Sequence, residues 1–157
     1  MEFIREERFS GSGLTLMPNE RSQSSIYKII GTGELAAKGQ DHQLLIRVNG
    51  EGKDYNSYVL MSGAHSTFEG APIGLTGFYV GRNGYGEDAT FSFEYILSVD
   101  SHAQKITGSG TSVFAHGNRV LGYQSFGYFV SNPPISSIQV LLTGDVEVSG
   151  RARLYRM

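Results

Sequence analysis

Hydrophobic and polar residues alternate along short stretches of this chain, which is the pattern of half-buried β-strands. The clearest stretch is Ala89–Asp100. Its odd-numbered positions carry the apolar side chains Phe91, Phe93, Tyr95, Leu97 and Val99, and its even-numbered positions carry Thr90, Ser92, Glu94 and Ser98, with Ile96 as the exception. One apolar and one polar face predict a strand of an antiparallel sheet that is buried on one side only.

Other strand candidates are short apolar runs bounded by glycine, proline or asparagine. They are Ile26–Ile30, Leu44–Val48, Tyr55–Met61, Phe78–Val80, Ala103–Gly108, Thr111–His116, Val120–Val130, Ile135–Thr143 and Arg151–Arg156. Glu34–Gln40 contains enough helix formers for one turn, which is too short to be stable alone. About eight to ten strands without a helical period predict an all-β fold, an antiparallel β-sandwich or jelly roll.

The stretch Leu44–Leu60 reads as two strands joined by a polar hairpin loop. Asn49-Gly50 supplies positive φ angles at low cost, and Gly52 adds a second permissive position. The two flanking runs are therefore expected to pair with each other. By the same reasoning, Ile135–Leu142 and Arg151–Tyr155 are expected to form an antiparallel hairpin across the loop at 144–149.

The chain of 157 residues is expected to form one domain with a substantial core. Residues 26–157 would form the sandwich. Residues 1–25 are polar and turn-rich, and we expect them to be an extended N-terminal arm. The arm has two interpretations: a frayed terminus, or a segment that packs on a neighbouring subunit.

Composition and charge exclude several classes of function. A formal net charge of -2 provides no basic excess for a phosphate backbone, so nucleic-acid binding is not expected. The absence of cysteine excludes disulfides and thiol chemistry. The charged start, MEFIREERF, is not a secretory signal, and no apolar run approaches the roughly 20 residues of a membrane span. We therefore expect a soluble protein, made in the cytoplasm, that does not bind membranes.

Candidate reactive groups are dispersed along the chain. Asn49, Glu51, Asp54 and Asn56 form an oxygen-rich loop of the kind that can bind Ca²⁺. They lack the spacing and the final Glu of an EF-hand, so a solvated loop is the simpler interpretation. The histidines His42, His65, His102 and His116 show no metal-binding spacing. No G-x-S-x-G elbow is present. We expect no catalytic residue, no metal and no cofactor.

Aromatic residues gather in glycine-rich segments. They are Phe78, Tyr79, Tyr85, Tyr123, Phe126, Tyr128 and Phe129. They could fill the core or a subunit interface, where such residues are common. Alternatively, exposed tyrosines could stack on sugars, and the candidate glycan contacts are then Tyr79, Tyr85, Tyr123 and Tyr128.

Three arginines recur along the last strand: Arg151, Arg153 and Arg156. They could protect an exposed edge strand from aggregation, or they could pair with acidic groups of a neighbouring subunit. Together with the apolar residues of the arm, the candidate subunit contacts are Phe3, Ile4, Phe9, Arg151 and Arg153.

Two segments carry a resemblance to a known group of proteins. LLIRVNGEGKDYNSYVL resembles the strand, Asn-Gly turn, Tyr, strand signature of many tailed-bacteriophage virion proteins. ISSIQVLLTGDVEVSGRARLYRM is similar to their C-terminal signature, an Ile-rich strand, a loop, a small residue beside Gly, and a last strand ending in Leu-Tyr. The order and spacing of the two segments extend the resemblance over residues 25–157.

The resemblance implies a non-enzymatic β-sandwich that serves as a capsid-decoration, cement, head-fibre or minor tail component. Its partners would be other virion proteins, and it would be assembled in the host cytoplasm. Because such accessories match local symmetry, a homo-oligomer is expected, with a trimer as one option. The alternative is a carbohydrate-binding adsorption module that recognises host surface glycans.

Overall fold

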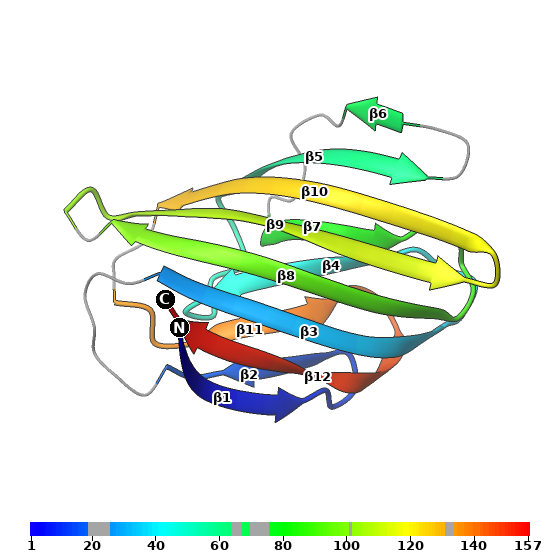
Figure 1. The fold of residues 1–157 in the computed structure, drawn as a ribbon, viewed down its shortest axis with the longest axis horizontal. Helices are drawn as coiled ribbons and strands as arrows, with labels where there is room; N and C mark the ends of the chain where they lie inside the picture. Colours follow the sequence, from blue (N-terminus) through cyan, green and yellow to red (C-terminus); the bar gives the residue numbers. More distant parts are fainter. Residues whose placement is uncertain (19–25, 64–66, 70–75, 101, 131–133) are drawn as a thin grey trace.

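The computed structural model describes residues 1–18, 26–63, 67–69, 76–100, 102–130 and 134–157. This part of the chain forms twelve strands, all paired antiparallel, in two sheets. The prediction of an all-β antiparallel sandwich is confirmed (Figure 1). A jelly roll has eight strands, so the sandwich form of the prediction is the one that fits.

The large sheet has eight strands. In spatial order they are β1 (Glu2–Arg8), β12 (Val146–Arg156), β3 (Ile26–Ala37), β8 (Ala89–Asp100), β9 (Lys105–His116), β10 (Arg119–Val130), β5 (Tyr55–Gly63) and β6 (Thr67–Glu69). The strands β8, β9 and β10 follow one another as a meander, and the two chain termini lie side by side at one end of the sheet (Figure 1).

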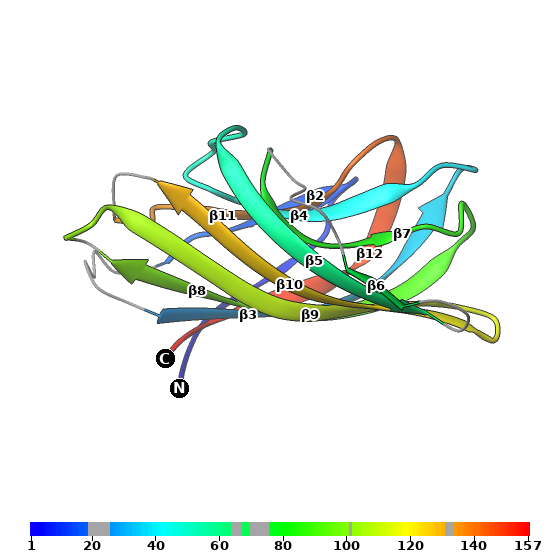
Figure 2. The same cartoon turned by 90° about the horizontal axis from the view of Figure 1, so that it is seen from above.

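The small sheet has four strands. They are β2 (Gly13–Leu16), β11 (Ile138–Leu142), β4 (His42–Val48) and β7 (Phe78–Asn83), in this spatial order. Figure 2 shows the small sheet packed against one face of the curved large sheet. The core lies between the two sheets, and the opposite face of the large sheet points outward.

Strand β8 has the alternation that the sequence predicts. Phe91, Phe93, Tyr95 and Leu97 are buried on the face toward the small sheet, whereas Thr90, Ser92 and Glu94 are exposed. Burial of a large apolar side chain stabilises a fold by about 1.5–3 kcal/mol. The buried side chains of β8 therefore favour the orientation in which this face of the large sheet points toward the core.

The rings of β8 lie against glycines of the neighbouring strands. A Cβ atom on Gly31 or Gly33 of β3 would overlap the ring of Phe93 or Phe91. On the other side, Gly108 and Gly110 of β9 leave the space that the ring of Tyr95 occupies. Each ring can thus lie against the adjacent strand because that strand carries no side chain there.

These glycines explain a difference from the predicted strand ends. The sequence predicts a strand that stops at Gly31 and two separate strands around Gly108–Gly110. Instead, β3 continues through Gly31 and Gly33 to Ala37, and β9 is continuous. Glycine is usually unfavourable inside a strand, but here each one accommodates a neighbouring ring, so ring packing outweighs the local preference.

The prediction of a hairpin at Leu44–Leu60 is wrong. Strand β4 lies in the small sheet and β5 in the large sheet, so the Asn49-Gly50 turn connects the two layers. The hydroxyl of Tyr55 accepts a hydrogen bond from the Val48 amide (2.9 Å) and donates one to the Glu51 carbonyl (3.0 Å). Because Tyr55 closes the loop from inside, the chain crosses between layers while both backbone groups remain hydrogen-bonded.

The expected C-terminal hairpin is also absent. Strand β11 pairs with β2 and β4 in the small sheet, whereas β12 pairs with β1 and β3 in the large sheet. Both strands bury one apolar face in the same core from opposite sides. The short loop between them therefore acts as a second crossing between the layers.

Residues 1–16 do not form a separate arm. Strand β1 pairs with β12 and β2 with β11, so this segment contributes an edge strand to each sheet. The physical reason is burial, because Leu14 and Leu16 of β2 and Phe9 in the connection are core residues. Residues 19–25, the rest of the predicted arm, lie outside the described residues.

Substitution of Gly31 tests the ring packing. We expect Gly31→Ala to lower the free energy of unfolding by about 1–3 kcal/mol, because the new methyl group would overlap the Phe93 ring. The matched control is Gly122→Ala in β10, where the nearest atom would be 3.7 Å away. Chemical denaturation compares the two; equal stability of both variants would contradict the packing argument.

The buried tyrosine Tyr55 predicts a loss of stability at high pH. Burial raises the pKa of Tyr55 to about 12, from its usual value near 10. The unfolded chain would therefore release this proton at lower pH than the folded chain, so stability should fall as pH rises from 10 to 12. Tyrosinate absorbance, followed together with circular dichroism, should show a late step that coincides with unfolding. In Tyr55→Phe that late step should shrink; complete tyrosine ionisation near pH 10 in a folded protein would contradict the prediction.

Candidate functional site

Three aromatic side chains lie together on the outward face of the large sheet. Tyr58 of β5 is directly opposite Phe126 of β10, and Tyr128 is on the same face two residues further along β10. They are 41%, 44% and 37% exposed. We call Tyr58, Phe126 and Tyr128 the aromatic patch.

Both apolar and amide groups border the aromatic patch. Asn56 lies opposite Tyr128, and Gln124 lies on the patch's own face beside Phe126, with both side chains exposed. Val130 continues the apolar surface along β10 and is 56% exposed. The patch can therefore bury ring surface and, at its rim, exchange hydrogen bonds with a partner.

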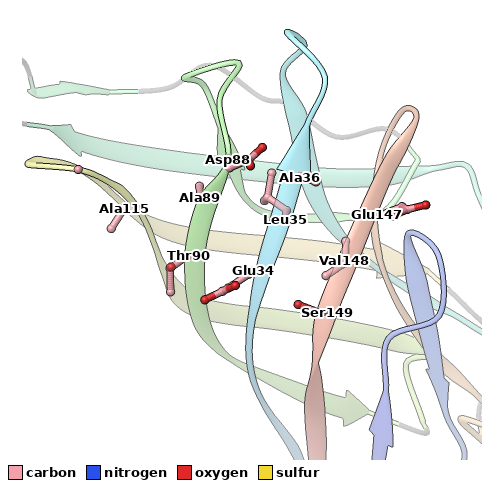
Figure 3. Close-up of a pocket in the computed structure, with 11 residues that line it drawn as sticks. Glu34, Leu35, Ala36, Asp88, Ala89, Thr90, Ala115, Glu147, Val148 and Ser149 are labelled. Atoms are coloured by element: carbon pink, nitrogen blue, oxygen red, sulfur yellow. The ribbon is translucent and has the colours of Figure 1, made fainter.

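A shallow basin occupies another part of the same face, over strands β12, β3, β8 and β9. It comprises adjoining hollows, one of which has a volume of about 510 Å³ (Figure 3). Its outward-facing residues are mostly small and hydroxylated, and we call them the outer basin: Arg8, Thr32, Glu34, Thr90, Ser92, Val113, Ala115, Ser149 and Arg151.

Carboxylates lie at one end of the outer basin. Glu34 of β3 projects outward beside Thr90, and Glu147 of β12 lies on the neighbouring strand (Figure 3). Asp88 is used within the fold, since its Oδ1 accepts a hydrogen bond from the Ala37 amide at 3.1 Å. Glu34 and Glu147 are both exposed and lie on an open surface, so they could accept hydrogen bonds from a ligand.

Arginines lie on the β1 and β12 side of the outer basin, and they share one hollow with Glu34. Arg8 of β1 and Arg151 of β12 are directly opposite each other across the strand pair. Glu6 accepts a hydrogen bond from Arg153 Nε at 2.6 Å and a longer one from Arg151 at 3.5 Å. The hydrogen bond from Arg153, with the positive charges of both arginines, lowers the pKa of Glu6 below its usual value.

The predicted subunit contacts fall into different environments. Phe9 is buried, and Ile4 packs partly against the core. Phe3 is 56% exposed and makes an edge contact with Tyr155, with ring centroids 5.7 Å apart. Only Phe3 among these three apolar residues thus presents a largely exposed side chain to a partner.

The interpretation of the last strand as an exposed edge is wrong. Strand β12 lies between β1 and β3, because the N-terminal segment adds one strand outside it. Arg151 and Arg153 contact Glu6 of β1, and Arg156 contacts Glu2 at 2.6 Å. These acidic groups belong to the same chain rather than to a neighbouring subunit.

The predicted glycan contacts do not form one exposed surface. Tyr79 and Tyr123 are only 3% and 5% exposed and belong to the core, so the prediction is wrong for these two. Tyr85 follows β7 in a loop, where the Arg119 guanidinium lies 4.6 Å from its ring centroid. Tyr128 belongs to the aromatic patch, whose other members the prediction missed. The spacing of Phe126 and Tyr128 by two could have indicated a shared outer face.

The oxygen-rich loop has a structural role at Asn49. Its Oδ1 accepts hydrogen bonds from the Ser136 amide (2.7 Å) and hydroxyl (2.9 Å), which fastens the β4–β5 crossing to the segment before β11. Among the residues that the structure describes, no group of three or more metal-binding side chains occurs.

The histidines also serve the fold. His42 is fully buried in β4, and its Nδ1 donates a hydrogen bond to the Thr143 carbonyl at 2.6 Å. His116 contacts the Glu87 carboxylate at 2.7 Å. His65 lies outside the described residues. The described part of the chain contains no helix that could cross a membrane.

Comparison with known proteins gives no family. No family model matches the chain, and no curated protein matches it. Among solved structures, a peanut lectin in complex with a nine-residue peptide was compared over 99% of both chains, with 7% sequence identity and a TM-score of 0.16. A score this low carries no argument about fold or function.

The ion pairs of Glu6 with Arg151 and Arg153 predict that stability falls in acid. Because the pKa of Glu6 is lowered in the folded state, its contribution to stability is present at neutral pH and is lost as pH falls through the folded-state pKa. We expect Glu6→Gln to have a lower melting temperature than the wild type at pH 7, and the difference should shrink toward pH 3. Glu51→Gln, an exposed loop variant, is the control. A difference that stays constant with pH would contradict the role of the Glu6 charge.

Proposed function

We propose that this chain is a non-enzymatic structural protein that attaches to other proteins through the aromatic patch. The observation that carries the proposal is the exposure of three adjacent rings, Tyr58, Phe126 and Tyr128, on an outward sheet face. Contiguous apolar surface of this kind marks interaction sites more often than isolated apolar residues do.

The physical argument concerns burial. Aromatic side chains carry large apolar area with few rotatable bonds, so they dominate the energetics of many interfaces. Tyr58 and Phe126 are cross-strand neighbours on a hydrogen-bonded strand pair. The strand pairing therefore fixes the backbone that carries the two rings before a partner arrives, which lowers the entropy cost of binding.

The setting that we propose is a tailed-bacteriophage particle, with the chain as a capsid decoration, cement or head-fibre component in a symmetric homo-oligomer. This part of the proposal is supported by the sequence resemblance in Leu44–Leu60 and Ile135–Tyr155. In the fold, those two segments supply the crossings β4–β5 and β11–β12. The proposed partners are other virion proteins.

A second candidate function is adsorption to host glycans through the same patch. The specific observation in its favour is the position of Asn56 and Gln124, two exposed amide residues on the same face that are strand neighbours of Tyr128 and Phe126. Sugar rings stack on aromatic faces through their C–H groups, while their hydroxyls need hydrogen-bond partners at the rim. The patch offers both.

The double variant Tyr58→Ser/Phe126→Ser tests attachment. Immunogold labelling with antibody to this chain should detect the wild-type protein on particles from its source. The number of copies bound per particle should fall at least about tenfold in the variant, because ring burial is lost. Val120→Thr, also outward-facing and 49% exposed, is the control and should keep full occupancy. If the wild-type protein labels no particle at all, the virion setting is contradicted.

A glycan array separates the second candidate from the first. If the patch binds sugars, uncharged host glycans should bind the wild type, and both Tyr128→Ala and Asn56→Ala should weaken that binding. Binding that survives both substitutions would rule out this surface as the glycan site. Melting temperatures confirm that each variant is folded.

A further inference from the structure

The β1 and β12 side of the outer basin concentrates positive charge that the fold does not neutralise. Arg8 and Arg151 lie directly opposite each other, an arrangement that costs stability when both side chains are cationic. Arg153 extends the same row along β12. Glu6 pairs with Arg151 and Arg153, so these two cations share one anion.

The Glu6 carboxylate contacts Arg153 more closely than Arg151. Its contact with Arg153 Nε is 2.6 Å, whereas its contact with Arg151 is 3.5 Å. Within the described part of the chain, Arg8 makes no ion pair. Arg8 and most of the donors of Arg151 therefore remain available beside a hollow of about 500 Å³, which Thr32, Ser149 and Gly150 also line.

We propose that Arg8 and Arg151 bind a carboxylate or sulfate group of an acidic polysaccharide whose chain continues over the outer basin. Two guanidinium groups can clamp such an anion with paired, charge-assisted hydrogen bonds. The proposal concerns a second site, on strands distant in the sheet order from the aromatic patch on β5 and β10.

The floor of the basin favours a saccharide over a peptide. Thr32, Ser92 and Thr90 project hydroxyls from adjacent strands, which repeat about every 4.8 Å across the sheet. A peptide that binds by strand addition would need backbone hydrogen bonds from a free strand edge. The backbones of β3 and β8 are paired on both sides here, so the floor offers only side chains, which suit sugar hydroxyls.

The charge distribution also fixes the direction of the ligand. Glu34 lies in the same hollow as Arg8 and Arg151, on the side toward β8. A carboxylate repels an anionic group but accepts hydrogen bonds from hydroxyls. The charged group therefore sits at the arginines, and the uncharged part of the sugar chain lies toward Glu34, Thr90 and Ser92.

Calorimetric titration of the full chain tests the site. The probes are oligogalacturonate, dextran sulfate, uncharged dextran and poly-glutamate. We expect both acidic polysaccharides to bind, more weakly as salt increases, and uncharged dextran to fail. Arg8→Gln/Arg151→Gln should weaken binding at least about tenfold, as expected for the loss of one or two charge-assisted hydrogen bonds.

A charge-matched control is Lys53→Gln/Arg119→Gln, which removes two positive charges elsewhere and should bind like the wild type. The floor variant Thr32→Val/Ser92→Val keeps every charge and should weaken oligogalacturonate binding. Melting temperatures verify folding. Three results would each overturn the proposal. The first is an equal loss of polysaccharide affinity in the Arg8/Arg151 variant and in its charge-matched control. The others are tighter binding of poly-glutamate than of either acidic polysaccharide, and no binding of any acidic polysaccharide.

Patch variants keep this test separate from the proposed function. Tyr58→Ser/Phe126→Ser should bind acidic polysaccharides as the wild type does, because the arginine pair is unchanged. If particle attachment fails while polysaccharide binding persists, only the virion proposal is lost. If polysaccharide binding fails while attachment persists, only the basin proposal is lost.

Discussion

The close packing of aromatic rings against glycines is the constraint on which the architecture depends. Phe91, Phe93 and Tyr95 each lie where an adjacent strand of the large sheet carries a glycine rather than a side chain. Protein interiors tolerate little empty or overlapping volume, so ring and glycine positions must match across strands. The register of β3, β8 and β9 is thereby specified by shape as well as by hydrogen bonds, and the large sheet can continue through positions that would otherwise interrupt its strands.

The two layers follow from the same packing. Because the rings of β8 project to one side, the large sheet presents a mostly apolar face. The small sheet packs against that face (Figure 2). The chain passes repeatedly between layers instead of completing one sheet first. Polar side chains stabilise a crossing where backbone groups would lose their partners: Tyr55 bonds both Val48 and Glu51, and Asn49 bonds Ser136.

One-sided burial leaves the outer face of the large sheet free for function. Its residues are not constrained by the core, so they can be selected for contact with other molecules. The face is chemically divided: exposed rings gather on β5 and β10, while arginines, hydroxyls and carboxylates gather over β1, β12, β3 and β8. This division is the basis of the two attachments proposed above, one through apolar burial and one through charge and hydroxyl groups.

The sequence by itself determined the fold class and, for β8, which side chains face the core. Alternation in Ala89–Asp100 predicted which side chains of β8 are buried, because side-chain direction along a strand has a period of two. Turn residues located the loops, and Asn49 and Gly50 have the positive φ angles expected there. These are local properties, and neighbouring residues suffice to specify them.

The tertiary structure alone decided which strands pair and which aromatics are exposed. Sequence adjacency suggested hairpins at β4–β5 and β11–β12, yet each pair is split between layers, since burial in a shared core outweighs proximity along the chain. Likewise, Tyr79 and Tyr123 are in the core and Tyr128 is on the surface. The residues next to a tyrosine in the sequence do not specify whether it is buried. Its burial depends on which face of the large sheet the small sheet covers. That relation is non-local and exists only when both sheets are assembled.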